Sequence, residues 1–273
     1  MKKIAVLGIN YKRCSTGMRE MVAIDKTQLP SHLKAIKSMV KEVVVLSTCN
    51  RTEIYVALNE EETAIKERLI SLWNGKADTL ADKFYFYTGL NTARHLFKVA
   101  GGLDSMVTGE TEILGQVRNA YQIAVEEEST GKTLSRLFHS SFRVGKKVRR
   151  ETKIANGLSS TSSVACKLAE NILGNLSAKR IMLIGLGKMG EVMMGYLKKK
   201  GVANLVVINR THEKADEVAK RFGVSAVRFE QCFDEMVKAD LVLTSSSAPH
   251  HLIEKKDIEE VMEIGRASCS ERV

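Results

Sequence analysis

The sequence predicts an α/β protein in which a small α+β domain precedes a second domain built on a parallel sheet. The chain has 273 residues, 44% of them apolar, which is enough for a folded core and corresponds to roughly two domains of about 150 residues each. Before about residue 155, β-rich runs alternate with helical patterns; after it, a buried strand leads straight into a glycine-rich turn and a helix. These two patterns assign the two parts to different folds.

The first part contains strands and helices in an order typical of a ferredoxin-like α+β domain with additional helices. We expect a strand at 3–9, a helical stretch to about residue 39, strands at 42–47 and 52–58, a helix at about 60–73 and a short aromatic strand at 83–87. The first run is a strand rather than a signal peptide, because charge returns at Lys12 after few apolar residues. From Asn91 onward the periodicity is helical.

A helix predicted over residues 131–150 has two different faces. At about 100° per residue, one side is apolar and the other carries five cations within about 60° of one another, Lys132, Arg136, Arg143, Lys147 and Arg150. This stripe is either a solvated surface or a contact for the phosphate backbone of a nucleic acid. The net charge of +10 and the pI near 9.3 permit an acidic partner without requiring one.

A polar segment separates the two parts. Asn156-Gly157 and the hydroxyl-rich residues 159–163 precede a new helical pattern. We therefore expect one domain at 1–155, a second and incomplete domain at 156–264, and a tail at 265–273 that lacks an apolar period.

The second part opens with a nucleotide-binding motif. Residues 180–184 (RIMLI) form a buried type of strand that leads into Gly185-Leu186-Gly187-Lys188-Met189-Gly190 and then a helix. This is the dinucleotide fingerprint of a Rossmann-type domain: Gly185 permits the tight turn, Gly187 lets the backbone approach a pyrophosphate, and Gly190 lets helix and strand pack closely. We expect all six residues to contact the cofactor.

The next strand, 204–208, ends in Asn209-Arg210-Thr211. An acidic residue there would accept hydrogen bonds from a ribose 2′-hydroxyl and repel a 2′-phosphate, whereas Arg210 can pair with the phosphate. The sequence therefore favours NADPH over NADH, with Asn209 and Arg210 in the site. The serine-rich loop at 245–249, after a strand at 239–244, is either a further cofactor contact or a plain turn.

The five cysteines are scattered along the chain. Cys14, Cys49, Cys166, Cys232 and Cys269 include no C-x-x-C pair, so we expect no metal site, free thiols and a reducing, cytoplasmic location. No run of about 18 uncharged apolar residues is present, so we expect no membrane span.

Cys49 is distinguished by its placement in a polar Ser-Thr-Cys-Asn-Arg segment at a strand end, where a thiol is accessible. Arg51 could lower its pKa by stabilising the thiolate, which would make Cys49 a nucleophile; the alternative is a structural cysteine. A thiolate combined with a nicotinamide suggests that an activated carboxyl group forms a thioester, which hydride reduces to an aldehyde. The cationic helix suggests tRNA as the activating group.

Three segments carry a resemblance to a known family: STCNRTEIY from Ser47, GGLDSMVTGETEILGQVRNAY from Gly101, and the GLGKMG loop. In this order they resemble glutamyl-tRNA reductase, the first committed enzyme of five-carbon tetrapyrrole (porphyrin) biosynthesis, over residues 1 to about 263. The resemblance implies an NADPH-dependent oxidoreductase that converts glutamyl-tRNA to glutamate-1-semialdehyde, releases tRNA, and works through a Cys49 thioester. The first domain would then be catalytic and the second would bind NADPH.

The resemblance also assigns residues. Cys49 matches the nucleophile and His95 a histidine important for activity, acting either as an acid or base or as an organiser of the pocket. The substrate-binding positions are Thr48, Asn50, Arg51, Ser105, Glu110, Thr111, Glu112 and Gln116. Arg51 suits a substrate carboxylate. The family usually has Pro-Gln at Thr111-Glu112, and a His-Lys-Thr-Ala-Pro-like run where residues 11–15 stand here, so we leave that loop out of the site.

Members of the family continue beyond the nucleotide domain into a helical dimerisation domain. We therefore expect a truncated chain whose residues 265–273 come from a cloning vector, a homodimer at full length, and a poorly active monomer in this form. The resemblance further implies glutamate-1-semialdehyde aminomutase as a partner.

Two other functions stay open. One is an NADP-dependent dehydrogenase of a small hydroxy acid, similar to shikimate dehydrogenases, which also have an Asn-Arg-Thr-like strand end. The other is a non-catalytic tRNA-binding module. The first leaves the Thr-Cys-Asn-Arg segment and the cationic helix unexplained.

Overall fold

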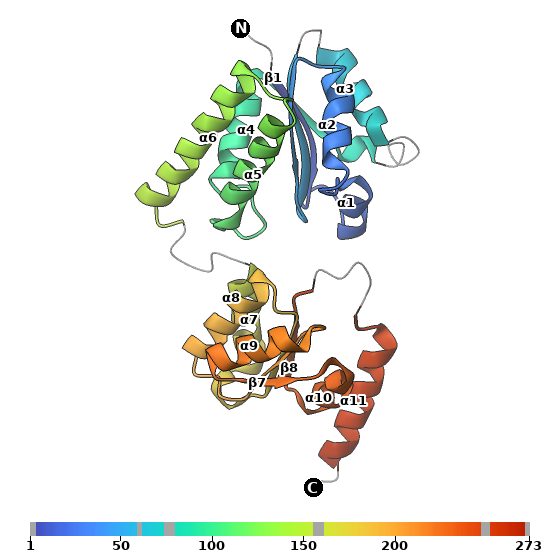
Figure 1. The fold of residues 1–273 in the computed structure, drawn as a ribbon, viewed down its shortest axis with the longest axis vertical. Helices are drawn as coiled ribbons and strands as arrows, with labels where there is room; N and C mark the ends of the chain where they lie inside the picture. Colours follow the sequence, from blue (N-terminus) through green and yellow to red (C-terminus); the bar gives the residue numbers. More distant parts are fainter. Residues whose placement is uncertain (1–3, 59–61, 74–79, 155–160, 247–251, 271–273) are drawn as a thin grey trace. The chain divides into compact units, whose positions relative to one another are not determined.

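The chain folds into two compact units, Met1–Ser160 and Thr161–Val273. Figure 1 draws the fold as a ribbon. The computed structural model describes residues 4–58, 62–73, 80–154, 161–246 and 252–270. Each unit has its own sheet and its own core.

The first unit contains an antiparallel sheet in the order β2-β3-β1-β4. Its strands are β1 (Ile4–Asn10), β2 (Glu42–Ser47), β3 (Arg51–Ala57) and β4 (Tyr85–Thr88). Helices α1 (Thr16–Val22) and α2 (Leu29–Lys37) follow β1, and α3 (Glu62–Ile70) follows β3. This β-α-β-β-α-β arrangement confirms the predicted ferredoxin-like fold.

Three additional helices cover the other face of this sheet: α4 (Gly89–Ala100), α5 (Glu112–Glu126) and α6 (Lys132–Glu151). Alternate residues of each strand enter two cores, so Val45 packs with α2 and α3 while Val44 packs with α4 to α6. Both faces are therefore buried, and the strands are apolar almost throughout.

Two predicted helical stretches are interrupted. The one expected to run to about residue 39 is two helices, because Asp25 Oδ1 accepts hydrogen bonds from the backbone N–H and the hydroxyl of Thr27 and closes a turn between them. The pattern from Asn91 ends with α4, and residues 101–111 form a loop that turns at Gly102 and Gly109, whose φ angles are +76° and +85°.

The second unit contains a parallel sheet in the order β7-β6-β5-β8. Its strands are β5 (Ile181–Ile184), β6 (Leu205–Ile208), β7 (Ser225–Val227) and β8 (Leu241–Thr244), and its helices are α7 (Thr161–Leu173), α8 (Lys188–Lys199), α9 (His212–Phe222), α10 (Cys232–Lys238) and α11 (Lys255–Ser270). This order confirms the Rossmann-type prediction, with the topological switch between β5 and β8. Short 3₁₀ helices occur at Ser71–Trp73, Ala81–Lys83, Leu176–Ala178 and Phe229–Gln231.

Most predicted strands agree with the structure to within a residue or two. The helices α9 and α10 and the strand β7, between Thr211 and residue 239, were not predicted. Helix α11 extends through residues 265–270 of the predicted tail, and residues 271–273 lie outside the described part of the chain.

Candidate functional site

The thiol of Cys49 lies at the tip of the hairpin that joins β2 to β3. Thr48 holds this turn: its hydroxyl accepts hydrogen bonds from the backbone N–H groups of Asn50 and Arg51, each at 3.2 Å, and its own N–H donates to Arg51 O at 2.8 Å. The Cys49 side chain is exposed. The predicted accessibility of this thiol therefore agrees with the structure.

A buried arginine that the sequence analysis missed fixes the same turn. Arg19 Nε donates to Cys49 O at 3.1 Å, its Nη1 donates to Cys14 O at 2.9 Å, and its Nη2 donates to the Thr16 hydroxyl at 3.1 Å. The guanidinium thus joins the start of α1 to the thiol-bearing hairpin. Sequence alone offered no signal for Arg19, because it lies 30 residues from Cys49.

The loop at residues 11–15, which we left out of the site, contacts it. The Tyr11 hydroxyl donates to Ser105 O at 3.0 Å and its N–H donates to Asn50 O at 3.0 Å, while Lys12 forms an ion pair with Asp104. This loop therefore connects the Cys49 hairpin to residues 101–111.

The pKa of the Cys49 thiol is raised. Desolvation by neighbouring atoms is the largest cause, and the negative charge of Glu110 adds to it, with a smaller contribution from Glu112. Arg19 is the cation that opposes this rise. The expectation that Arg51 lowers the pKa of Cys49 is wrong, because the Arg51 guanidinium pairs with the carboxylates of Glu53 and Asp104 instead.

Arg51 is buried, and both of its Nη groups donate to acceptors of the protein. Nη1 lies 2.8 Å from Glu53 Oε1 and 3.1 Å from Asp104 Oδ2, and Nη2 donates to Asp104 O. Burial alone would lower the pKa of Arg51, but the charges of Glu53 and Asp104, the Tyr85 hydroxyl and the hydrogen bond to Glu53 together outweigh it, and the pKa is raised. Arg51 therefore ties β3 to the 101–111 loop, and contact with a substrate carboxylate would require it to exchange one of these acceptors.

Glu53 is the centre of a buried network. Its carboxylate accepts hydrogen bonds from Arg51, Tyr55 and Tyr85, and it lies 2.8 Å from His95 Nε2. Burial would raise the pKa of Glu53, but the charges of Arg51 and His95 and these hydrogen bonds hold it well below its usual range.

His95 extends from α4 into this network. Its ring lies 5.1 Å from the Tyr85 ring and 5.3 Å from the Tyr87 ring. Because the acceptor at Nε2 is an ionised carboxylate, Nε2 carries the proton and Nδ1 is the nitrogen left for other partners. The structure joins His95 to Arg51 through Glu53.

The second predicted substrate segment begins in the 101–111 loop. Ser105 is 4% exposed, and its hydroxyl has no hydrogen-bond partner among the residues described. Asp104, which the sequence analysis missed, accepts from Asn10, Lys12 and Arg51; burial would raise the pKa of Asp104, but Lys12 and Arg51 lower it. Glu110, Glu112 and Gln116 are half-buried, whereas Thr111 is exposed and precedes α5.

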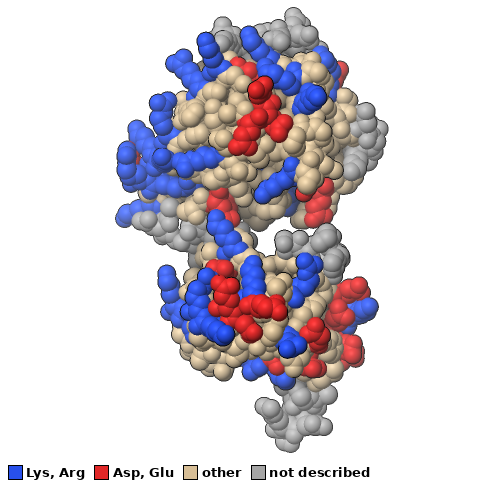
Figure 2. Space-filling view, in the orientation of Figure 1, with Lys and Arg blue, Asp and Glu red and all other residues tan. Residues whose placement is uncertain are grey.

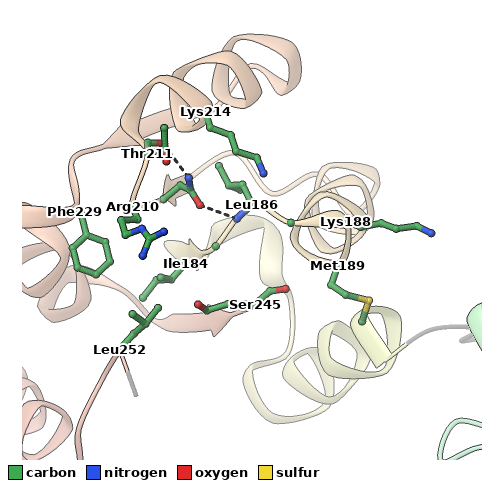
Figure 3. Close-up of a pocket in the computed structure, with 14 residues that line it drawn as sticks. Ile184, Leu186, Lys188, Met189, Arg210, Thr211, Lys214, Phe229, Ser245 and Leu252 are labelled. Atoms are coloured by element: carbon green, nitrogen blue, oxygen red, sulfur yellow. Dashed lines mark hydrogen bonds between the residues drawn. The ribbon is translucent and has the colours of Figure 1, made fainter. Parts of the chain in front are cut away.

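The second unit contains a pocket of 600 Å³ at the carboxyl ends of β5, β6 and β8 (Figure 3). Its lining is Ile184, Gly185, Leu186, Gly187, Lys188, Met189, Asn209, Arg210, Thr211, Lys214, Phe229, Ser245, Ser246 and Leu252. Seven of the eight predicted cofactor residues line it, and Gly190 does not. Ser245 and Ser246 of the serine-rich loop also line it, and residues 247–249 of that loop lie outside the described chain.

Each glycine of the motif has a separate reason to lack a side chain. Gly185 has a φ of +89°, and a Cβ there would lie 2.2 Å from Ser245 O. A Cβ on Gly190 would lie 2.3 Å from Gly185 O, where α8 packs against β5. A Cβ on Gly187 would meet nothing within 4 Å, which leaves room above the start of α8 for a pyrophosphate.

The pocket is cationic. Its lining includes Lys188, Arg210 and Lys214 and no carboxylate. Asn209 holds the two loops together, since its Oδ1 accepts from Leu186 N at 3.5 Å and its Nδ2 donates to Thr211 O at 3.0 Å. Lys214, in the first turn of α9, was missed. In Figure 3 the Arg210 guanidinium points into the pocket and Lys188 points away from it.

Some classes of site are absent from the described residues. No three His, Cys, Asp or Glu side chains among them form a group that could hold a metal ion. The described cysteines, Cys14, Cys49, Cys166 and Cys232, are free thiols. Within the same part of the chain, no helix combines the length and the apolar character that crossing a membrane requires.

Comparisons with known proteins divide the chain at the same place as its fold. Residues 7–152 match the family model for the N-terminal domain of glutamyl-tRNAGlu reductase, and residues 167–270 match the model for shikimate / quinate 5-dehydrogenase. Among solved structures, glutamyl-tRNA reductase from Methanopyrus kandleri is 33% identical with a TM-score of 0.57, and the match covers 96% of this chain and 63% of that one.

Curated relatives of the chain belong to the same family. The chain is 42% identical to the glutamyl-tRNA reductase of Geotalea daltonii and 39% identical to that of Geobacter sulfurreducens, in each case over 264 residues. Each match covers 95% of this chain and 61% of the relative. The chain therefore spans about three fifths of the length of the relatives it matches.

Proposed function

This chain belongs to the glutamyl-tRNA reductase family, and we propose that it carries out the NADPH-dependent reduction of glutamyl-tRNA to glutamate-1-semialdehyde, the first step of five-carbon porphyrin biosynthesis. The observation that carries the proposal is an exposed thiol, Cys49, on a hairpin fixed by Thr48 and Arg19 in the part of the chain that matches the family model. The pocket in the second unit supports the proposal, because it offers a binding site for the reductant NADPH.

The chemistry follows from the thiol. The Cys49 thiolate attacks the ester carbonyl carbon of the glutamyl group, the bond from that carbon to the tRNA ribose oxygen breaks, and free tRNA leaves as the alcohol after taking up a proton. The product is a glutamyl thioester on Cys49. The pocket lining, with Arg210 and Lys214, would hold NADPH, which would supply the hydride that reduces the thioester carbonyl to an aldehyde while Cys49 leaves as the thiolate.

Charges around the hairpin fit an amino-acid substrate. Glu110 and Glu112 are close enough to Cys49 to raise its pKa, and their carboxylates provide an acceptor for the α-ammonium of the glutamyl group. We assign the partnerless hydroxyl of Ser105 and the free Nδ1 of His95 to further polar contacts. Thr48, Asn50 and Arg51 support the turn and its loop, and Thr111 and Gln116 belong to the same segment.

The cofactor preference rests on charge. Arg210 and Lys214 line the pocket beyond the end of β6, and no carboxylate lines it, so a 2′-phosphate finds two cations and no repulsion. A nicotinamide cofactor is consistent with the match to a dehydrogenase family, and the two cations favour NADPH.

Further proposals concern assembly and location. In keeping with the family, we propose that the full-length protein is a cytoplasmic homodimer, that the present chain alone is a monomer, and that a glutamate-1-semialdehyde aminomutase receives the unstable aldehyde. Sedimentation at micromolar concentration tests the monomer, which a stable dimer would contradict.

The decisive test is covalent labelling. Protein incubated with radiolabelled glutamyl-tRNA in the absence of NADPH should retain the label on Cys49, and Cys49→Ser should retain none. Cys14→Ser is the matched control, because Cys14 is a half-buried thiol near the same arginine, and it should label like the parent protein. Absence of label in the parent protein, or equal label in Cys49→Ser, would show the mechanism to be wrong.

The match of residues 167–270 to shikimate / quinate 5-dehydrogenase favours one other candidate, a dehydrogenase of a small hydroxy acid. That activity would use the pocket and would leave Cys49 without a role. NADP-dependent turnover of hydroxy acids in the absence of tRNA, unaffected by Cys49→Ser, would establish it.

A further inference from the structure

Helix α6 presents a long cationic surface. Its members, which we call the α6 cationic face, are all exposed: Lys132, Arg136, Arg143, Lys146, Lys147 and Arg150. They extend along about 27 Å of helix, at 1.5 Å per residue. The sequence from Lys132 to Arg150 contains no acidic residue and, on this face, no large apolar one. Figure 2 shows the concentration of basic side chains on this side of the first unit.

The face is not explained by helix stability. Lys132 and Arg136, Arg143 and Lys147, and Lys146 and Arg150 are like-charge pairs four residues apart, and each such pair destabilises a helix. Within the described chain, Lys132, Arg136, Arg143 and Lys146 have no carboxylate within salt-bridge distance, and Lys147 and Arg150 reach only Glu151. Unpaired, mutually repelling cations in a row indicate a polyanionic partner.

The face leads toward the thiol. At the start of α6, the N–H groups of Thr133 and Leu134 donate to the Glu42 carboxylate at the beginning of β2. At its end, Arg149 Nη2 donates to Glu110 O at 3.0 Å. The start of α6 therefore lies at the start of β2, and its end lies beside Glu110, whose charge acts on Cys49.

Aromatic groups and a further cation adjoin the face. His139 is exposed on it, and its ring lies 5.2 Å from the Tyr121 ring and 5.6 Å from the Phe142 ring. Arg118 of α5, also exposed, lies over the Phe142 ring at 5.7 Å. The combination of aligned cations, arginine and aromatic rings is typical of RNA contacts, whereas a protein partner would need an apolar anchor that this face lacks.

We propose that the α6 cationic face binds the phosphate backbone of a double-helical arm of tRNA and delivers its aminoacyl end to Cys49. This rests on the proposed function for the identity of the RNA. The face contributes affinity and register but no base recognition, because Lys and Arg side chains on phosphates are indifferent to sequence.

The test compares two triple variants of the whole chain. Arg136→Gln, Arg143→Gln and Lys146→Gln together remove three unpaired cations from the face; Lys26→Gln, Lys34→Gln and Lys41→Gln remove three exposed cations around α2, on the opposite face of the sheet. Binding of fluorescent, unacylated tRNA is followed by anisotropy over a KCl series. The face variant should lose roughly 2 to 3 from the slope of log K against log[KCl], at about 0.7 to 0.9 per phosphate contact, and the control should keep the parent slope.

Three outcomes decide the proposal. An unchanged slope in the face variant would overturn it and leave an acidic protein as the partner of this surface. An equal loss in the control would overturn it too, since net charge alone would then account for binding. A charge-conserving variant, Arg136→Lys with Arg143→Lys, should retain the slope, and its failure to do so would contradict backbone binding. Labelling of the parent protein by glutamyl-tRNA is a separate measurement, so failure of the proposed function is distinguishable.

Discussion

The two candidate sites of this chain are built in opposite ways. The thiol site is assembled from side chains that are far apart in sequence: Arg51 meets Asp104 across 53 residues, and Arg19 meets Cys49 across 30. The nucleotide pocket is assembled mainly from one turn of backbone, residues 184–189, and the end of the next strand. One site depends on which side chains are present, and the other on where side chains are missing.

The two sites should therefore fail in different ways. In the first unit, a buried carboxylate and a buried guanidinium neutralise each other, and loss of either leaves the other charge in the core without its buried partner. In the second unit, the main hazard is an added atom in a tight turn. Substitutions that remove a buried charge in the first unit, or add a methyl group in the second, test this difference between the two sites.

The largest effect is expected at Glu53. Glu53→Gln removes the fully buried carboxylate that pairs with Arg51, which leaves only the partly exposed Asp104, and should destabilise the first unit by about 3–5 kcal/mol. Trp73, the one tryptophan of the chain, is buried in this unit, so its fluorescence during urea unfolding reports on this unit alone. Glu151→Gln is the control: it lies in the same unit and its partners Lys147 and Arg150 are exposed, so the urea midpoint should be nearly unchanged. Equal, small losses in both variants would contradict the buried network.

A smaller effect is expected at two glycines that look alike in sequence. Gly190→Ala forces a Cβ against Gly185 O and should cost the second unit about 1–3 kcal/mol. Gly187→Ala meets nothing within 4 Å, so the fold should be unchanged while NADPH binding weakens, because the methyl group enters the space for the pyrophosphate. Thermal unfolding followed by circular dichroism, together with NADPH fluorescence titration, separates the two. A stable Gly190→Ala variant with normal affinity would refute the packing argument.

The same contrast explains how much could be predicted from sequence. The pocket could be predicted from sequence because its motif is local. Its lining includes Gly185 to Met189, Asn209 and Arg210. The exposure of the Cys49 thiol could be predicted because a polar segment at a strand end is typical of a turn. The cationic stripe of α6 could be predicted because helical periodicity determines which side chains share a face.

Most of the site contacts that were not predicted join residues far apart in the sequence. Arg51 was expected to act on Cys49, its neighbour in sequence, but strand pairing directs it to Glu53 and Asp104. Arg19 and Asp104 had no local pattern that could identify them, because their partners are set by how β1, β3 and the 101–111 loop pack. Lys214 was missed because it lies in α9, a helix that the sequence analysis did not predict.

Cofactor discrimination gives an intermediate prediction within the second unit. Arg210→Gln should weaken NADPH by about tenfold, the equivalent of one charge-assisted hydrogen bond of about 1.5 kcal/mol, and leave NADH nearly unchanged. Lys188→Gln is the matched control, since Lys188 also lines the pocket but points away from it in Figure 3. Fluorescence titrations with both cofactors measure the ratio. A parallel loss of NADPH and NADH affinity in Arg210→Gln would remove the 2′-phosphate assignment.

The smallest effect concerns the thiol itself, where the first unit acts through charge without contact. Glu110 raises the pKa of Cys49 because a nearby negative charge disfavours the thiolate. Glu110→Gln removes that charge, so the pKa should fall and the rate of Cys49 alkylation by iodoacetamide, followed on its peptide by mass spectrometry, should rise at lower pH than in the parent protein. The pocket offers no counterpart to this tuning, because its glycines act by leaving space. Glu127→Gln, on an exposed residue beyond α5, should leave the profile in place. A profile that moves to higher pH in Glu110→Gln would mean that Glu110 holds the thiol through a contact and not through its charge.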